Sequence, residues 1–358
     1  MWKKVEYTKK EINEAGRRII DKNLTEEERQ HYLEIIDNWR AAHAFPTNTF
    51  AMNLKRKVEK IPGAFVVQRL KRLDTIVKKL ERFPKMELYR MQDLGGCRVV
   101  VPTIKDVYSL VTELRYSRMR HEEHNYKDYI SSPNPKTGYR GYHLIYRYKS
   151  DKNDTYNGLQ VEIQIRTYLQ HLWATAVETV GLFTDNDLKF NKGSQDWLDF
   201  FQLTSILFAI NEMNVTEEEL GVDLIRALRP WARLLKKLDV IPTLGSIGIA
   251  TYRLGHIQKK YKNCKGYYLI TLSFDTKRVQ VTVFKNAERA TDAYNKFENE
   301  NTNTKNSGVL VSAQSYETLV TAYPNYFLNI TDFFEEVQKL LEQYRAKLDE
   351  LQNGDSKG

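Results

Sequence analysis

The sequence predicts a β-sheet covered by helices, of the α/β or α+β class, and three observations support this. Between residues 97 and 180, short strand-like runs alternate with helical patterns. Helical patterns also precede this segment and return over 195–238. A second group of strand-like runs begins near residue 261. The length of 358 residues suits roughly two domains and a sizeable core.

The first eighty residues read as helices. Thr25 followed by Glu28 matches a capping box, in which each side chain satisfies a free backbone N–H group. Apolar and aromatic residues then recur at helical spacing as far as His43, and we expect Pro46 to end that helix. Another helix is expected from about Val66 to Arg82.

The middle of the chain changes to a period of two. In VEIQIR (161–166), the apolar side chains point one way and the polar ones the other. Ser, Pro, Gly and Asn concentrate in ISSPNPKTGYRG, which predicts a loop. The expected elements are a strand at 97–101, a helix at 105–116, a loop at 130–141, hairpin strands at 142–148 and 159–166, and a helix at 168–180.

The last third combines a hairpin with helices. YYLITLSF and RVQVTVF alternate and flank a short polar turn, which predicts a β-hairpin over 267–284. The expected elements after it are a helix at 286–299, a strand at 309–313 and a C-terminal helix with one apolar stripe from Phe333 to Leu348. We expect a domain boundary near residue 260.

Composition narrows the class of protein. Lys and Arg (55) exceed Asp and Glu (46), and a net charge of +9 suits either polyanionic partners such as nucleotides, RNA or DNA, or a merely solvated basic surface. Two cysteines suit a reducing compartment and exclude a disulfide framework. The N-terminus has no signal-peptide pattern, and no apolar run approaches the roughly eighteen residues that span a bilayer. We expect a cytoplasmic protein with no membrane partner.

Two segments suggest anion and metal binding. RLKRLDTIVKKL (69–80) carries five basic residues against Asp74, which suits either a polyphosphate ligand or a solvated face. Asp93 precedes a Gly-Gly turn into a strand. There it could bind Mg²⁺, which prefers one or two carboxylates plus substrate phosphates, or simply cap the turn.

Two further segments suggest a nucleotide acceptor. Tyr139 lies in a glycine-flanked loop, where it could stack on a nucleobase or anchor the loop by packing. Glu162, Gln164 and Arg166 share one face of a strand, a mixture suited to a metal, a hydroxyl and a phosphate. Together these segments indicate metal-assisted phosphoryl-type transfer.

The ordered motifs RxK, DLGGCRVV, KDYI, GYRGYH, VEIQIRT and QHLWA closely resemble the synthetase domain of the RelA/SpoT family of alarmone synthetases. The resemblance covers about residues 66–180 and implies an α+β fold with a nucleotidyltransferase-like mixed sheet flanked by helices. Members move the pyrophosphate of ATP onto the 3′-hydroxyl of a guanine nucleotide with Mg²⁺.

Roles follow from the resemblance, motif by motif. Asp93 and Glu162 would hold Mg²⁺, and Glu162 would also help to deprotonate the attacking hydroxyl. Tyr139 would stack on the acceptor base, with His143 supporting the acceptor and its phosphates. The remaining residues expected to bind ATP or the acceptor are Arg69, Lys71, Lys79, Arg98, Lys127, Lys136, Arg140, Gln164 and Arg166.

The N-terminal flank resembles the toxic small alarmone synthetases. NWRAAHAFPTNTF (38–50) carries this resemblance, and several such enzymes use the 3′-CCA end of tRNA as acceptor, which inhibits translation. A strip from Ala51 to Leu80 holds nine basic residues against Glu59 and Asp74, a net charge of +7. That density suits an RNA backbone. A synthetase of free (p)ppGpp or ppApp and a non-catalytic RNA-binding sensor are the alternatives.

The C-terminal region resembles the pseudo-zinc-finger antitoxin domain of the CapRel proteins, which are fused toxin–antitoxin systems in anti-phage defence. It has the ββαβα order and a YxxY motif at Tyr323 and Tyr326, whose alternative is ordinary core packing. The resemblance implies a toxin at 1–260, an antitoxin domain at 261–330 and a C-terminal helix at 331–358. Tyr323 and Tyr326 would block the ATP site until a phage capsid protein binds. We expect no zinc, since Cys264 lacks partners, and a monomer.

Overall fold

The computed structural model describes residues 2–183, 195–213, 224–244, 266–273, 278–301, 306–313 and 330–355. Its first helices are α1 (Lys9–Arg18), α2 (Glu26–Ala42) and α3 (Ala44–Val58). The capping box of Thr25 and Glu28 is confirmed at the start of α2. The prediction that Pro46 ends a helix is wrong, because Pro46 lies in the first turn of α3. Proline is tolerated there because first-turn N–H groups have no partner within the helix.

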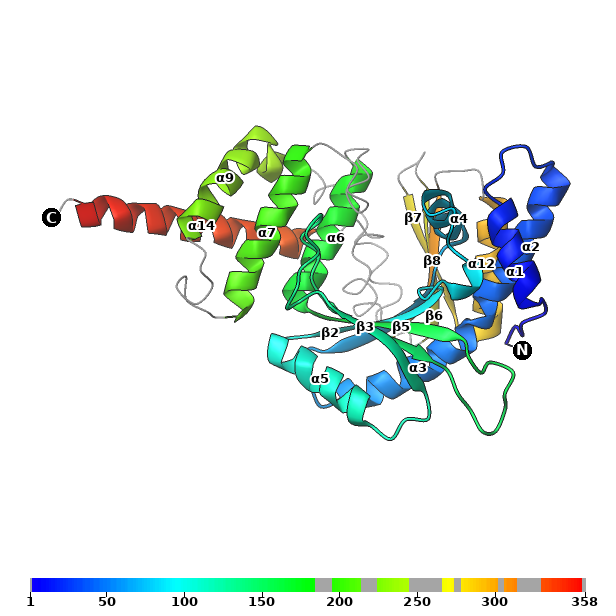
Figure 1. Cartoon of the computed structure of the whole chain (residues 1–358). Helices are drawn as coiled ribbons and strands as arrows, with labels where there is room; N and C mark the ends of the chain where they lie inside the picture. Colours follow the sequence, from blue (N-terminus) through cyan, green and yellow to red (C-terminus); the bar gives the residue numbers. More distant parts are fainter. Residues whose placement is uncertain are drawn as a thin grey trace.

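A five-stranded mixed sheet forms the centre of the molecule (Figure 1). Its spatial order is β1-β2-β5-β4-β3, with β2 and β5 parallel and every other neighbouring pair antiparallel. The predicted α+β class with a mixed sheet and flanking helices is confirmed. The strands are β1 (Phe65–Leu70), β2 (Gly95–Val101), β3 (Glu122–Asp128), β4 (Tyr142–Arg147) and β5 (Gln160–Thr167).

The helix expected over 66–82 is wrong in its first part. Residues 65–70 form β1, and helix α4 begins only at Leu73 and ends at Arg82. FVVQRL is rich in aromatic and β-branched residues, and it pairs along its whole length with β2. Arg69 therefore lies on a strand and Lys79 on a helix, rather than on one crowded helix.

Strand β3 was missed by the sequence analysis. Its sequence EEHNYKD is polar, and six of its seven residues are exposed. It lies at the edge of the sheet, where it pairs only with β4 within the described part of the chain. An exposed edge strand needs no apolar face, so it has no period-two signal.

The alternation in β5 determines which face of the sheet is polar. Val161, Ile163 and Ile165 are fully buried, as predicted, in the core beneath the sheet. Helix α3 and helix α5 (Ile104–Tyr116) cover that face (Figure 1). The opposite face carries the polar side chains of Glu162 and Gln164.

A second buried cluster joins helices that are distant in the sequence. It contains α6 (Tyr168–Phe183), α7 (Gln195–Met213), α9 (Leu224–Lys237) and the C-terminal helix α14 (Thr331–Asp355). The predicted stripe of α14 contributes Phe333, Val337 and Leu340 to this cluster. The C-terminal helix therefore completes the core above the sheet.

A second, three-stranded sheet lies beside β1. It has the order β7-β6-β8, from β6 (Gly266–Ser273), β7 (Arg278–Phe284) and β8 (Ser307–Ala313), and it confirms the predicted hairpin. Helix α12 (Ala287–Glu300) precedes β8, and β8 packs against β1 (Figure 1). The expected boundary near residue 260 and the YxxY motif lie outside the described residues.

No helix in the described ranges combines the length and apolar character that a bilayer-spanning segment requires.

Candidate active site

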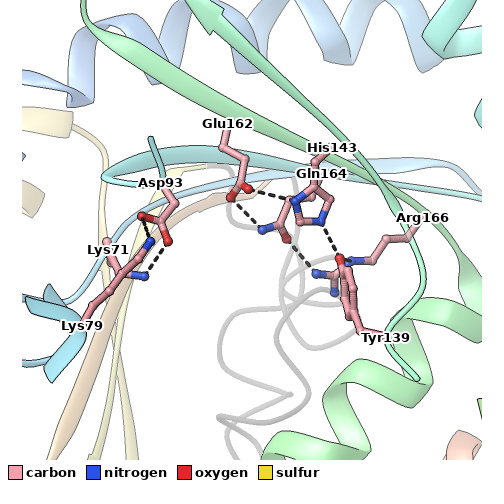
Figure 2. Close-up of polar contacts among 8 residues, drawn as sticks. All are labelled: Lys71, Lys79, Asp93, Tyr139, His143, Glu162, Gln164 and Arg166. Carbon is pink, nitrogen blue, oxygen red and sulfur yellow. Dashed lines mark hydrogen bonds and ion pairs between the residues drawn. The ribbon is translucent and has the colours of Figure 1, made fainter. Parts of the chain in front are cut away.

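The predicted carboxylates lie at two neighbouring parallel strands, one on β5 and one just before β2. Glu162 is in the middle of β5, opposite Gly96 of β2, and Asp93 comes just before β2 begins. The two carboxylates are close enough for Asp93 to raise the pKa of Glu162 by repulsion. Figure 2 shows both side chains on the same side of the sheet.

Cross-strand registers place the other predicted residues on the same face. Arg98 of β2, Gln164 of β5, His143 of β4 and Lys127 of β3 lie opposite one another in one row across four strands. Residues opposite in a ladder share a face, so this row lies beside the row of Glu162. Arg69 of β1 is opposite Gly96 and belongs to the row of Glu162.

Two lysines clamp Asp93. The Nζ atoms of Lys71 and Lys79 lie 2.8 and 2.9 Å from its two carboxylate oxygens (Figure 2). Burial by itself would raise the pKa of Asp93, but the two ammonium groups outweigh it and hold that pKa well below its usual value. Asp93 is therefore ionised, and the same lysines provide positive charge for an incoming phosphate chain.

A chain of hydrogen bonds connects Glu162 to Tyr139. His143 Nδ1 lies 2.9 Å from Glu162 Oε1, and His143 Nε2 lies 2.6 Å from the Tyr139 hydroxyl. Gln164 donates to Glu162 at 2.8 Å, and Arg166 donates to Gln164 at 2.8 Å and to the Tyr139 hydroxyl at 3.1 Å (Figure 2). The acid, amide and guanidinium predicted to share one face of β5 are therefore joined, through His143 and Tyr139, in one hydrogen-bonded network.

The electrostatics of this network favour a charged imidazole. Burial by itself would lower the pKa of His143, but Tyr139 and Glu162 outweigh it and raise that pKa to about 9. Burial would raise the pKa of Glu162, but the His143 ion pair lowers it overall. Near neutral pH the site therefore holds an imidazolium beside an ionised carboxylate.

Tyr139 is turned inward rather than fully exposed. Its ring is half-buried, with the Arg166 guanidinium carbon 5.0 Å from the ring centre and the Trp173 ring 6.4 Å away. Gly138 has φ +76°, which favours glycine. A Cβ atom at Gly141 would lie 2.9 Å from the Tyr139 hydroxyl. The two glycines thus allow the loop to fold the ring onto the site.

The structure does not bring every predicted residue into this group. Lys136 is exposed on the loop. Arg140 is buried and pairs with Glu212 of α7. Glu212 was missed because it lies 72 residues from Arg140, in a helix whose sequence carries no motif.

The donor set fits Mg²⁺, which the predicted chemistry implies. Asp93 and Glu162 supply two ionised carboxylates beside a basic cluster, and Mg²⁺ is commonly held by one or two carboxylates plus substrate phosphates. Among the described residues, no three side chains of His, Cys, Asp or Glu gather as a metal-binding group.

Comparison with known proteins finds a family match over the segment that contains this site. Residues 68–181 match the family model described as the region found in RelA / SpoT proteins. All the residues in Figure 2 lie within that segment.

Two curated relatives cover the same segment. The GTP pyrophosphokinase YjbM of Bacillus subtilis is 34% identical over 116 residues, which is 32% of this chain and 54% of that protein. The GTP pyrophosphokinase YwaC of Bacillus subtilis is 31% identical over 128 residues, 34% of this chain and 59% of that protein. The chain thus spans little more than half the length of these relatives.

Among solved structures, small alarmone synthetase 1 of Bacillus subtilis, bound to its product pppGpp, is 24% identical with a TM-score of 0.41. That similarity covers 52% of this chain and 98% of the other.

Proposed function

We propose that this chain is an ATP-dependent pyrophosphokinase of the RelA/SpoT type. One observation carries the proposal: inside the matched segment, Asp93 lies two residues before β2 and Glu162 lies on the paired parallel strand β5, between a lysine pair and a base-stacking candidate. The ribose 3′-oxygen of the acceptor bonds to the β-phosphorus of ATP, the bond from that phosphorus to the α-phosphate oxygen breaks, and AMP leaves.

The side chains would divide this work between donor and acceptor. Lys71 and Lys79 bind and orient the phosphate chain, together with Arg69 and Arg98 on the same face. Glu162, held ionised by His143, accepts the proton of the attacking hydroxyl. Mg²⁺ held by Asp93 and Glu162 would neutralise charge on the transferred group. Tyr139 and Arg166 orient the acceptor base and its phosphates.

We propose the 3′-CCA end of tRNA as the acceptor, with inhibition of translation as the result. The basic strip supports this, since its nine positive residues run along the chain from α3 through β1 to α4 and the segments between them. The second candidate is the synthesis of (p)ppGpp from free nucleotides. It is favoured by the similarity to two proteins named GTP pyrophosphokinases.

One labelling experiment separates the two acceptors. The full chain is incubated with γ-³²P-labelled ATP, Mg²⁺ and either total tRNA or GDP and GTP. Label in the tRNA band supports the first candidate, and label only in a nucleotide product supports the second. Absence of label from every acceptor contradicts both.

We further propose that the C-terminal region inhibits the enzyme, as in the CapRel toxin–antitoxin proteins that it resembles. Residues 1–260 would be the toxin and 261–330 a pseudo-zinc-finger antitoxin domain, opened by a phage capsid protein in a cytoplasmic monomer. Tyr323 and Tyr326 would block ATP. Neither tyrosine lies in the described residues.

Contacts between the C-terminal region and the part of the chain expected to bind ATP support the proposed inhibition. Strand β8 packs against β1, which carries Arg69. Glu298 of α12 accepts a hydrogen bond of 3.1 Å from the Leu73 N–H at the start of α4, and Arg40 donates to Asn295 at 3.0 Å. A carboxylate thus occupies the positive end of the helix that carries Lys79.

A further inference from the structure

A buried carboxylate joins helix α7 to the acceptor side of the site. The side chains of Glu212 and Arg140 are 5% and 3% exposed, and Glu212 Oε2 lies 2.5 Å from an Arg140 guanidinium nitrogen. The hydroxyl of Thr167 donates to the other carboxylate oxygen. Gln170 of α6 also donates to Glu212, at 3.3 Å. The Glu212 side chain of α7 therefore contacts the end of β5, the start of α6 and the loop from Lys136 to Arg140, here called the Tyr139 loop.

The residues that Glu212 holds are neighbours of the acceptor residues. Arg140 follows Tyr139, and Thr167 follows Arg166. Tyr139 and Arg166 are hydrogen-bonded to each other. Fixing the backbone next to both residues fixes the distance between the aromatic ring and the guanidinium.

Two polar side chains of α7 hold the remainder of the loop. Ser205 donates to the carbonyl oxygen of Gly138 at 2.6 Å, and Gln202 donates to that of Lys136 at 2.6 Å. Both bonds reach backbone atoms, so they hold the path of the loop whatever its side chains do. The Tyr139 loop is thus built onto α7 from Lys136 to Arg140.

Among the bonds between α7 and the Tyr139 loop, the Glu212–Arg140 ion pair should cost the most free energy to break. Within the described residues, Arg140 Nε and Nη2 have no hydrogen-bond partner, so the guanidinium depends on Glu212. Removing one partner of a buried pair leaves an uncompensated charge in a low-dielectric environment. Neutralising Glu212 should therefore displace Arg140, and with it the loop.

We infer that Glu212 is a positioning residue that sets the affinity for the acceptor through Arg140 and Thr167, without touching the acceptor itself. This inference presupposes the proposed pyrophosphate transfer and adds the device that prepares its acceptor subsite. The donor residues Arg69, Lys71 and Lys79 lie on and after β1, at the other edge of the sheet. Loss of the Glu212 charge should therefore raise the KM for the acceptor more than the KM for ATP.

The test compares Glu212→Gln with a matched control in the full chain. Asp196→Asn serves as the control, because Asp196 lies on the same helix and pairs with Lys237 at the surface. In Glu212→Gln, backbone amides of residues 129–141 should exchange hydrogen faster, and those of 69–80 should not change. The KM for the acceptor, with tRNA, GDP and GTP tested in turn, should rise about tenfold or more while the KM for ATP stays within about twofold. Asp196→Asn should change neither.

Unchanged exchange in residues 129–141, or an equal rise in both KM values, would overturn the inference. If Glu212→Gln does not fold, the double variant Arg140→Met with Glu212→Met removes both charges and leaves none unpaired. It also loses the bonds of Thr167 and Gln170 to Glu212, so faster exchange in residues 129–141 and a higher KM for the acceptor are still expected. If no acceptor is ever labelled, the proposed function fails, and hydrogen exchange alone decides whether Glu212 positions the loop.

Discussion

The ion pair of His143 and Glu162 predicts a specific pH dependence of stability. The pKa of His143 is about 9 in the folded chain, against 6.5 for an unperturbed imidazole. Because the folded state binds this proton more tightly, its contribution to stability is fully present below pH 6.5 and is lost as the pH rises toward 9. Glu162 has a lowered pKa, so its contribution is present above its usual value of 4.5 and is lost in acid.

The size of the effect follows from the pKa of His143. One pKa unit corresponds to about 1.4 kcal/mol, so the rise from 6.5 to about 9 corresponds to about 3 kcal/mol. That is a large share of the roughly 5–15 kcal/mol by which a typical domain is stable. Tyr139 is the larger cause of the raised pKa and Glu162 the next, so replacing Glu162 with Gln should remove part of this contribution.

Urea unfolding at a series of pH values measures this contribution. The free energy of unfolding of the native chain should fall by about 2–3 kcal/mol between pH 6.5 and 9, and that of Glu162→Gln should fall less. His143→Asn, which cannot titrate there, is the control for other groups. A native chain whose stability is flat over that interval, or an imidazole that titrates below pH 7 by NMR, would refute the electrostatic reasoning.

Three other predictions test the donor side, the inhibitory contact and the C-terminal helix. Lys79→Met should raise the KM for ATP about tenfold, measured by steady-state kinetics, because it removes a charged contact near the phosphate chain; an unchanged KM would contradict the donor role. Glu298→Gln should speed amide exchange at residues 73–76 and increase basal pyrophosphate transfer a few-fold, whereas Glu300→Gln, at an exposed position of the same helix, should do neither. Phe333→Ala should lower the free energy of unfolding by about 3–5 kcal/mol, with a smaller loss for the partly buried Phe334→Ala, and a loss below about 1 kcal/mol for Phe333→Ala would show that α14 is not part of the core.

The C-terminal helix also changes how a shortened chain should be interpreted. Phe333 packs against Phe201 and Phe208 of α7, with ring centres 6.0 and 5.9 Å apart. A chain that ends at residue 260 loses this packing together with any inhibitory contact. Point substitutions in the full chain therefore test inhibition more cleanly than truncation does.

Local signals explain what could be predicted from the sequence. The capping box at Thr25 and the alternation in VEIQIR depend only on neighbouring residues, and both are confirmed. Glu162, Gln164 and Arg166 could therefore be placed on one face before their partners were known. Asp93 could be singled out because two glycines and a strand-like run follow it closely, and both glycines belong to β2 itself.

Features that depend on distant partners could not be predicted. FVVQRL becomes a strand because β2 pairs with it, whereas the sequence alone suggested one helix between Pro62-Gly63 and Pro84. Strand β3 exists because β4 supplies its hydrogen bonds. The lysine clamp on Asp93 and the Glu212–Arg140 pair each join residues from separate elements, and no spacing rule connects them.

The products formed from ATP test the central claim most directly. Transfer from the β-phosphorus releases AMP, whereas transfer of a single terminal phosphoryl group releases ADP. The native full chain, given Mg²⁺, ATP and its acceptor, should form one AMP for each acceptor labelled, and Asp93→Asn and Glu162→Gln should form almost none. ADP as the product, or AMP and labelled acceptor formed equally well by both variants, would contradict the assignment of these two carboxylates.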